Sequence, residues 1–103
     1  MEIINDVEFN SKVTESSKPV LVDFFATWCG PCRQMLPIVT EISEEMPEIT
    51  VYKMDVDESP NTPETLDIQS LPTLILFKDG KPVAKKTGPM LKVELINWIK
   101  SNI

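Results

Sequence analysis

The string Trp28-Cys29-Gly30-Pro31-Cys32 holds both cysteines of this chain of 103 residues, which contains no histidine. Two thiols at this spacing are close enough to bond to each other. A framework of several disulfides needs more cysteines, and a four-ligand zinc site needs more ligands than one chain offers here. The spacing therefore indicates a redox-active pair, and a zinc site would require two chains that share four thiolates.

The two cysteines are expected to differ in role, because a long helix is predicted to begin at this point. Cys29 would lie at the exposed helix start, where free amide N–H groups and the helix dipole favour a thiolate. Cys32 follows three residues later on the same face, inside the first turn. We therefore predict that Cys29 is the attacking thiol and Cys32 the resolving thiol. Gly30 would let a partner backbone approach, and Pro31 suits an early helical position.

A single acid, Asp23, interrupts the apolar run of residues 20–25 just before the cysteine pair. A buried, unpaired carboxylate is costly, so it usually takes up a proton or a partner. With a raised pKa, Asp23 would accept the proton of Cys32 as a general base. The alternative is a structural acid bonded to backbone or water. Lys53, on the next predicted strand, is either its partner or a solvent-facing lysine.

The elements that position these residues follow from hydrophobic periodicity and turn signals. Strands are predicted at 2–4, 20–25, 50–56, 73–77 and 82–87, and helices at 6–16, from the cysteine pair to about 46, at 60–66 and at 92–101. Val7 and Val93 are expected to face the core from the first and last helices. Asp79-Gly80 predicts a hairpin turn. The order βαβαββα of the elements from residue 20 onward, together with right-handed crossovers, predicts an α/β fold, a central mixed sheet with helices on both faces.

Length and composition fit one domain spanning 1–103, with 42% hydrophobic and 25% charged residues. A formal net charge of −6 argues against nucleic acid as a partner. No apolar run approaches the length of a membrane span, and residues 1–6 lack the pattern of a signal peptide. We therefore expect a cytoplasmic protein. Lysines gather in residues 78–103, where they are interpreted as solvated side chains that protect an edge hairpin.

The chain resembles the thioredoxin family over essentially its whole length. The resemblance rests on the string 28–32 together with Asp23, Lys53, the Leu71-Pro72-Thr73 segment and Gly88, all in the family's register. It implies the thioredoxin fold and the reduction of protein disulfides through a mixed disulfide at the first cysteine. It also implies that no cofactor or metal takes part and that a thioredoxin reductase recharges the pair.

The resemblance further implies positions for the substrate. Pro72 would be cis and would face the disulfide, whereas its residue type alone indicates only the start of a strand. An apolar docking surface for an extended substrate segment would comprise Trp28, Gly30, Pro31, Leu71, Pro72 and Gly88. Substrates would include ribonucleotide reductase, peroxiredoxin or methionine sulfoxide reductase, and a monomer is expected. Phe25, Asp67 and Pro89 depart from the residues common in the family.

A second hypothesis is a binding module with the same fold that holds partners without turnover. The presence of both cysteines counts against it. The same motif also serves oxidases and isomerases, whose direction depends on the dipeptide between the cysteines. Gly30-Pro31 resembles that of the reducing members.

Overall fold

In the computed structural model, which describes residues 1–103, five strands form one mixed sheet in the order β1-β3-β2-β4-β5. The strands are β1 (Glu2–Ile3), β2 (Val20–Phe25), β3 (Thr50–Asp55), β4 (Thr73–Lys78) and β5 (Lys81–Thr87). Strands β1, β3 and β2 are parallel, whereas β4 runs antiparallel to both β2 and β5. This is the predicted mixed sheet.

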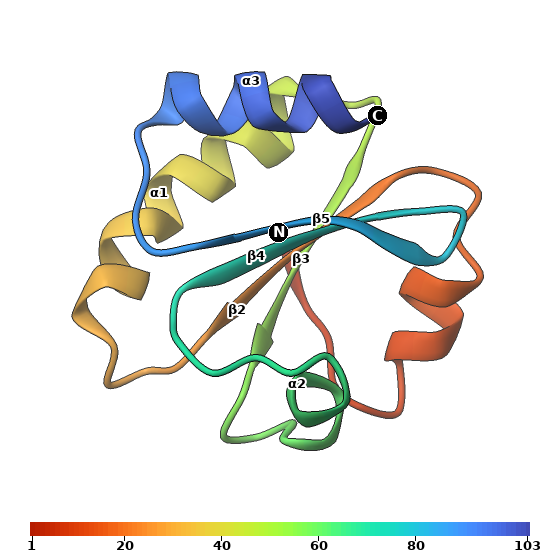
Figure 1. The fold of residues 1–103 in the computed structure, drawn as a ribbon, viewed down its shortest axis with the longest axis vertical. Helices are drawn as coiled ribbons and strands as arrows, with labels where there is room; N and C mark the ends of the chain where they lie inside the picture. Colours follow the sequence, from red (N-terminus) through yellow and green to blue (C-terminus); the bar gives the residue numbers. More distant parts are fainter.

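Four helices cover the sheet: η1 (Asn10–Thr14), a short π-helix, α1 (Gly30–Glu45), α2 (Asn61–Thr65) and α3 (Lys92–Asn102). Helices α1 and α3 lie on one face, and η1 and α2 lie on the other (Figure 1). Elements β2 to α3 follow the predicted order βαβαββα, and β1 and η1 precede them. Helices on both faces are thus confirmed.

The central strand β2 divides the core between the two faces. Leu21 packs with the buried residues of α1 and α3, whereas Val20, Val22 and Phe24 pack in the cluster on the η1 side. Because side chains alternate along a strand, Asp23 points to the same face as Leu21, toward α1. The carboxyl group of Asp23 therefore lies between the sheet and α1, the helix that begins at the cysteine pair.

Two expectations about helix faces are wrong. Val7 is 90% exposed, because residues 6–8 form a turn and only the following segment becomes helical. Asn5 and Glu8 exchange side-chain hydrogen bonds with each other's backbone N–H at this turn, as in a capping box. Val93 is 61% exposed, and α3 instead buries Leu95 and Ile99.

The hairpin between β4 and β5 turns at the predicted dipeptide. Asp79 and Gly80 both have positive φ, at 54° and 77°, as a two-residue hairpin turn of the primed type requires. A Cβ on Gly80 would collide with the backbone carbonyl of Thr14, so the turn packs closely against η1. Strand β5 lies at the sheet edge with Lys81, Lys85 and Lys86 exposed, as expected for a protected edge.

The helices are also too short or too polar to be membrane spans.

Candidate active site

The cysteine pair lies where the chain leaves β2 and enters α1. Cys29 is the N-cap of α1, with extended backbone angles, and its Sγ accepts a hydrogen bond of 3.2 Å from the N–H of Cys32. Pro31 lies within the first two positions of the helix, where no backbone N–H is needed. The two sulfurs are bonded in a disulfide, with the Cα atoms 5.3 Å apart. The helix start therefore directs an amide at the sulfur of Cys29.

The two cysteines differ little in solvent exposure, although the sequence predicted an exposed Cys29 and a more buried Cys32. Cys29 is only 5% exposed and Cys32 3%, so the expected exposed helix start is wrong for this disulfide form. The disulfide packs against Ala26 and half-buried neighbours, which shields both sulfurs. What distinguishes the cysteines is their surroundings, since each lines a different hollow.

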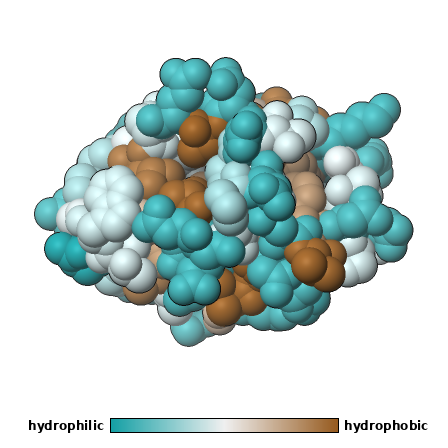
Figure 2. Space-filling model, turned by 90° about the horizontal axis from the view of Figure 1, so that it is seen from below, coloured by the Kyte–Doolittle hydropathy of each residue, from teal (hydrophilic) through white to brown (hydrophobic).

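Cys29 borders a largely apolar groove of about 290 Å³. The groove is lined by Trp28, Cys29, Val56, Pro63, Ile68, Gln69, Ser70 and Leu71. Trp28 is 68% exposed, and its Nε1–H donates a hydrogen bond of 2.8 Å to Asp57 Oδ2. The end of the molecule to which β2 and β3 lead carries several hydrophobic patches between hydrophilic side chains (Figure 2).

The segment that enters β4 forms another side of this region. The Leu71–Pro72 peptide bond is cis, and the Pro72 carbonyl accepts a hydrogen bond of 2.8 Å from the N–H of Gly88. Gly88 has a φ of 84° and open space where a Cβ would lie. Pro72 is buried, Leu71 and Gly88 are half-buried, and Pro31 is exposed. Of the residues expected to form the docking surface, Trp28, Leu71, Pro72 and Gly88 thus lie on loops, and Gly30 and Pro31 lie in the first turn of α1.

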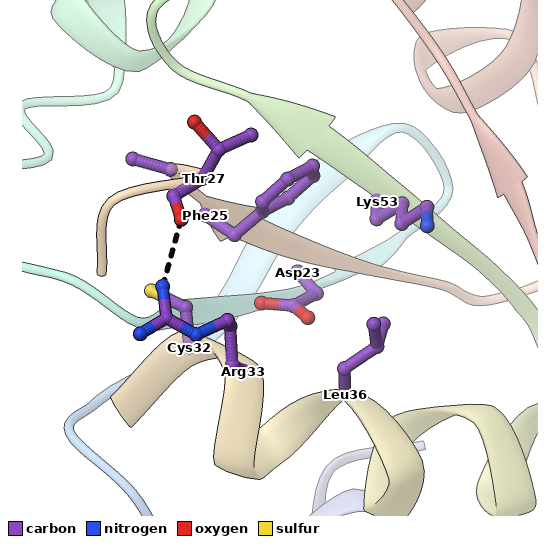
Figure 3. A pocket seen from close by; sticks show the side chains of 8 residues that line it. Asp23, Phe25, Thr27, Cys32, Arg33, Leu36 and Lys53 are labelled. Carbon is purple, nitrogen blue, oxygen red and sulfur yellow. Dashed lines mark hydrogen bonds between the residues drawn. The ribbon is translucent and has the colours of Figure 1, made fainter. Parts of the chain in front are cut away.

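Cys32 lines a different cavity of about 230 Å³ between β2, β3 and α1 (Figure 3). Asp23 projects into this cavity, is 1% exposed, and has an Oδ1 atom without a hydrogen-bond partner. Burial raises the pKa of the Asp23 carboxyl to about 7, although the positive charge of Lys53 opposes the increase. A carboxyl with this pKa is suited to exchange protons near neutral pH.

Lys53 stands opposite Asp23 in the β2–β3 register and lines the same cavity. The two side chains form no salt bridge, since the ion pairs of the protein involve only Lys12 and Lys92. The Lys53 Nζ instead lies 5.8 Å from the centre of the Phe25 ring. Neither interpretation of Lys53 holds in full, because it forms no ion pair with Asp23 and its side chain is half-buried, so it is a neighbour that acts on Asp23 through its charge.

The structure contains no group of three or more histidine, cysteine, aspartate or glutamate side chains arranged to hold a metal ion.

A family model described as Thioredoxin matches residues 1–101 of the chain. The chain belongs to the thioredoxin family. It is 46% identical to a thioredoxin of Rickettsia conorii over 101 residues, which cover 97% of this chain and 96% of that protein. It is 48% identical to a thioredoxin of Mycobacterium tuberculosis over 94 residues, which cover 90% of this chain and 81% of that protein.

The thioredoxin-family protein is accordingly an oxidoreductase that reduces protein disulfides through its Cys29–Cys32 pair. Its substrates are disulfide-containing proteins, and a reductase partner must return the pair to the dithiol form. The resemblance drawn from the motif and the cysteine spacing is thereby confirmed.

The departures from the thioredoxin-family pattern have visible local consequences. Asp67 adopts a left-handed φ of 56° although it is not glycine, and its Oδ1 accepts a hydrogen bond from Gln69. Phe25 lines the Asp23 cavity and places its ring beneath Lys53. The left-handed turn is therefore retained without glycine.

Sequence reasoning missed Asp57, which holds the indole of Trp28, and the groove residues Val56, Pro63 and Ile68. Asp57 is separated from Trp28 by 29 residues, so no local spacing connects the two. The available signal was an acidic loop directly after the β3 strand, because side chains that follow neighbouring parallel strands meet at one sheet edge.

Proposed function

We propose that Cys29 attacks the substrate disulfide and that Cys32 resolves the mixed disulfide. The Cys29 thiolate would bond to one substrate sulfur while the other leaves as a thiolate and takes a proton from water. Cys32 would then lose its proton and attack Cys29, which breaks the bond to the substrate and releases the second thiolate. The substrate gains two electrons, and the cysteine pair is oxidised to the disulfide.

Asp23 is proposed to accept the proton of Cys32 in the second step. The observation that carries this role is the unpartnered Asp23 carboxyl in the cavity that Cys32 lines. Lys53 would tune this carboxyl through its charge, because its ammonium group opposes the effect of burial on the Asp23 pKa. The amide of Cys32 and the dipole of α1 would favour the thiolate of Cys29 in the first step.

The substrate is proposed to lie as an extended segment across the docking surface formed by Trp28, Gly30, Pro31, Leu71, Pro72 and Gly88. The groove beside Cys29 supports this path because it adjoins the attacking sulfur and most of its lining residues are apolar. Candidate substrates are ribonucleotide reductase, peroxiredoxin and methionine sulfoxide reductase, and the candidate reductase is a thioredoxin reductase. We propose a cytoplasmic monomer consisting of one thioredoxin domain over residues 1–103.

Reduction of insulin disulfides, with dithiothreitol as recycling reductant, tests the assignment. The wild-type protein should accelerate insulin precipitation, and Cys29→Ser should not exceed the uncatalysed rate. Trp28→Ala should raise KM for insulin more than it lowers kcat, because Trp28 is assigned to docking and not to the thiol exchange. Turnover by Cys29→Ser at the wild-type rate would contradict the proposed roles.

A further inference from the structure

Arg33 connects α1 to the loop after β2 beside the Asp23 cavity. Its Nη1–H donates a hydrogen bond of 2.8 Å to the carbonyl oxygen of Thr27, and both residues line the cavity (Figure 3). The first turn of α1 is already held by the Cys29 cap, so this contact is not needed to start the helix. It joins the two segments that flank Cys32 on the side of the protein open to solvent.

We infer that Arg33 is a positioning residue that covers the Asp23 cavity and keeps bulk water away from the carboxyl that serves Cys32. This inference rests on the proton-accepting role proposed for Asp23. The cover consists of the guanidinium group, which the hydrogen bond to Thr27 holds in place. A planar guanidinium loses less rotamer freedom per hydrogen bond than an ammonium group on a flexible stem, so it is held more firmly in this position.

Such a cover matters because the carboxyl inside the cavity would bind any water that reached it. Asp23 Oδ1 lacks any hydrogen-bond donor in the protein, so water that entered would hydrate it. The charged groups that line the cavity with the carboxyl are Lys53 from β3 and Arg33 from α1, and Cys32 is held in the disulfide. On its other side Asp23 is paired in register with Leu74 of β4, which carries no charge. Arg33 can therefore act on the carboxyl in two ways, through the access of water to the cavity and through its own positive charge.

A cover and a simple positive charge have opposite effects on the pKa of the Asp23 carboxyl. Removing a nearby positive charge disfavours the carboxylate and raises the pKa, whereas admitting water favours the carboxylate and lowers it. A hydrated carboxylate is also a weaker base for the Cys32 proton, so the second step of the reaction should slow while the first step is retained. The sign of the change therefore distinguishes the two explanations.

The test compares oxidised wild-type protein with Arg33→Ala, Arg33→Lys and the control Lys100→Ala. Lys100 is an exposed lysine of α3, and its removal changes the net charge by the same amount. The Asp23 pKa is measured from the carboxyl carbon shift by NMR. We expect Arg33→Ala to lower the pKa by about one unit or more. Arg33→Lys, which keeps a donor and the charge, should shift it less, and Lys100→Ala should leave it unchanged.

The same variants are then mixed with a disulfide peptide, and the mixed disulfide is followed by rapid quench. Arg33→Ala should prolong its lifetime by about threefold to tenfold without slowing its formation. An unchanged or raised Asp23 pKa in Arg33→Ala would overturn the inference. Wild-type resolution in Asp23→Asn would instead overturn the proposed role of Asp23, while the NMR titration of Arg33→Ala would still decide whether Arg33 is a cover.

Discussion

Asp23 and Lys53 occupy directly paired positions on β2 and β3, yet their side chains do not form an ion pair. Lys53 lies instead over the Phe25 ring, and the Asp23 carboxyl remains in the cavity with one oxygen unpartnered. A direct salt bridge would hold the carboxyl ionised and make it a poor proton acceptor. The separation of the two groups is what leaves Asp23 able to change its charge near neutral pH.

The pH dependence of folding should reveal this carboxyl. Burial raises the Asp23 pKa from 3.8 to about 7, so the folded state holds a proton that the unfolded state has already lost between these values. The free energy of unfolding of the oxidised protein should therefore fall by about 4 kcal/mol as the pH rises from about 4 to about 7. Urea unfolding at a series of pH values measures this change.

Asp23→Asn should remove that dependence and gain about 2–4 kcal/mol of stability at pH 8, because a costly buried charge is absent. Glu48→Gln, which removes an exposed acid, serves as the control and should retain the wild-type slope. A variant Asp23→Asn that is less stable than wild type at pH 8, and resolves mixed disulfides normally, would identify a structural acid.

The two cysteines should be distinguishable by trapping. Cys32→Ser retains the attacking thiol but lacks the resolving one, so a covalent adduct with substrate should accumulate at Cys29 and dissolve on addition of reductant. Cys29→Ser should form little adduct. Intact-mass spectrometry after incubation with a disulfide peptide gives the result, and equal adduct formation through Cys32 would mean that the roles are reversed.

The fluorescence of Trp28 should report the redox state. Its indole lines the groove beside Cys29 and is fixed by the hydrogen bond to Asp57, so breaking the disulfide changes its immediate neighbour. In a Trp98→Phe background, which leaves Trp28 as the only tryptophan, emission should change on reduction with dithiothreitol. Superimposable spectra of the two redox forms would contradict this placement of the indole.

Gly80 and Gly88 offer a matched pair for backbone strain. Both have positive φ, but a Cβ at Gly80 would meet the Thr14 carbonyl, whereas the space at Gly88 is open. Gly88→Ala should cost about 1 kcal/mol from its left-handed backbone, and Gly80→Ala about 3 kcal/mol because Thr14 must also move. Urea unfolding compares the two variants, and equal losses would argue against the close packing of the hairpin turn on η1.

Asp6 should contribute stability with the opposite pH dependence to Asp23. Its carboxylate accepts hydrogen bonds from the N–H groups of Asn61 and Thr62 at the start of α2, at 3.1 and 2.8 Å. Burial acts to raise its pKa, but the hydrogen bonds from these two residues together outweigh burial and lower the pKa below 3.8. The carboxylate therefore stabilises the fold above about pH 4, and this contribution is lost as the pH falls through the folded pKa.

Asp6→Ala should cost about 1 kcal/mol at pH 7, as expected for loss of a cap. At pH 2 the difference between variant and wild type should shrink. A constant difference at both pH values would show that the side chain acts through packing and not through its charge.

Hydrophobic periodicity and turn residues were sufficient to predict most of the fold. Strands β2 and β3 and the Asp79-Gly80 hairpin follow from patterns contained in each segment. The exposure of Val7 could not be predicted in this way, because the spacing of apolar residues does not show where a turn replaces a helix. Hydrogen bonds between distant segments could not be predicted either, because no local pattern connects their residues.

In the candidate site, the spacing of the motif indicated the cysteines, and the interruption of the apolar run of residues 20–25 indicated the buried acid. The partner of Trp28 and the hydrogen bond from Arg33 to Thr27 depend on how the loops after β2 and β3 and the start of α1 meet in space. The cis bond before Pro72 came from family resemblance, since most X–Pro bonds are trans.

The core on the α1 side of the sheet includes Met90, Leu95 and Ile99 from the last segment of the chain. During synthesis, the cover that α1 forms over this face of the sheet therefore stays incomplete until these residues have left the ribosome. The opposite face is completed by Phe77 and earlier residues. The nascent chain consequently carries an apolar face that α1 covers only in part for the interval in which β5 and α3 are made.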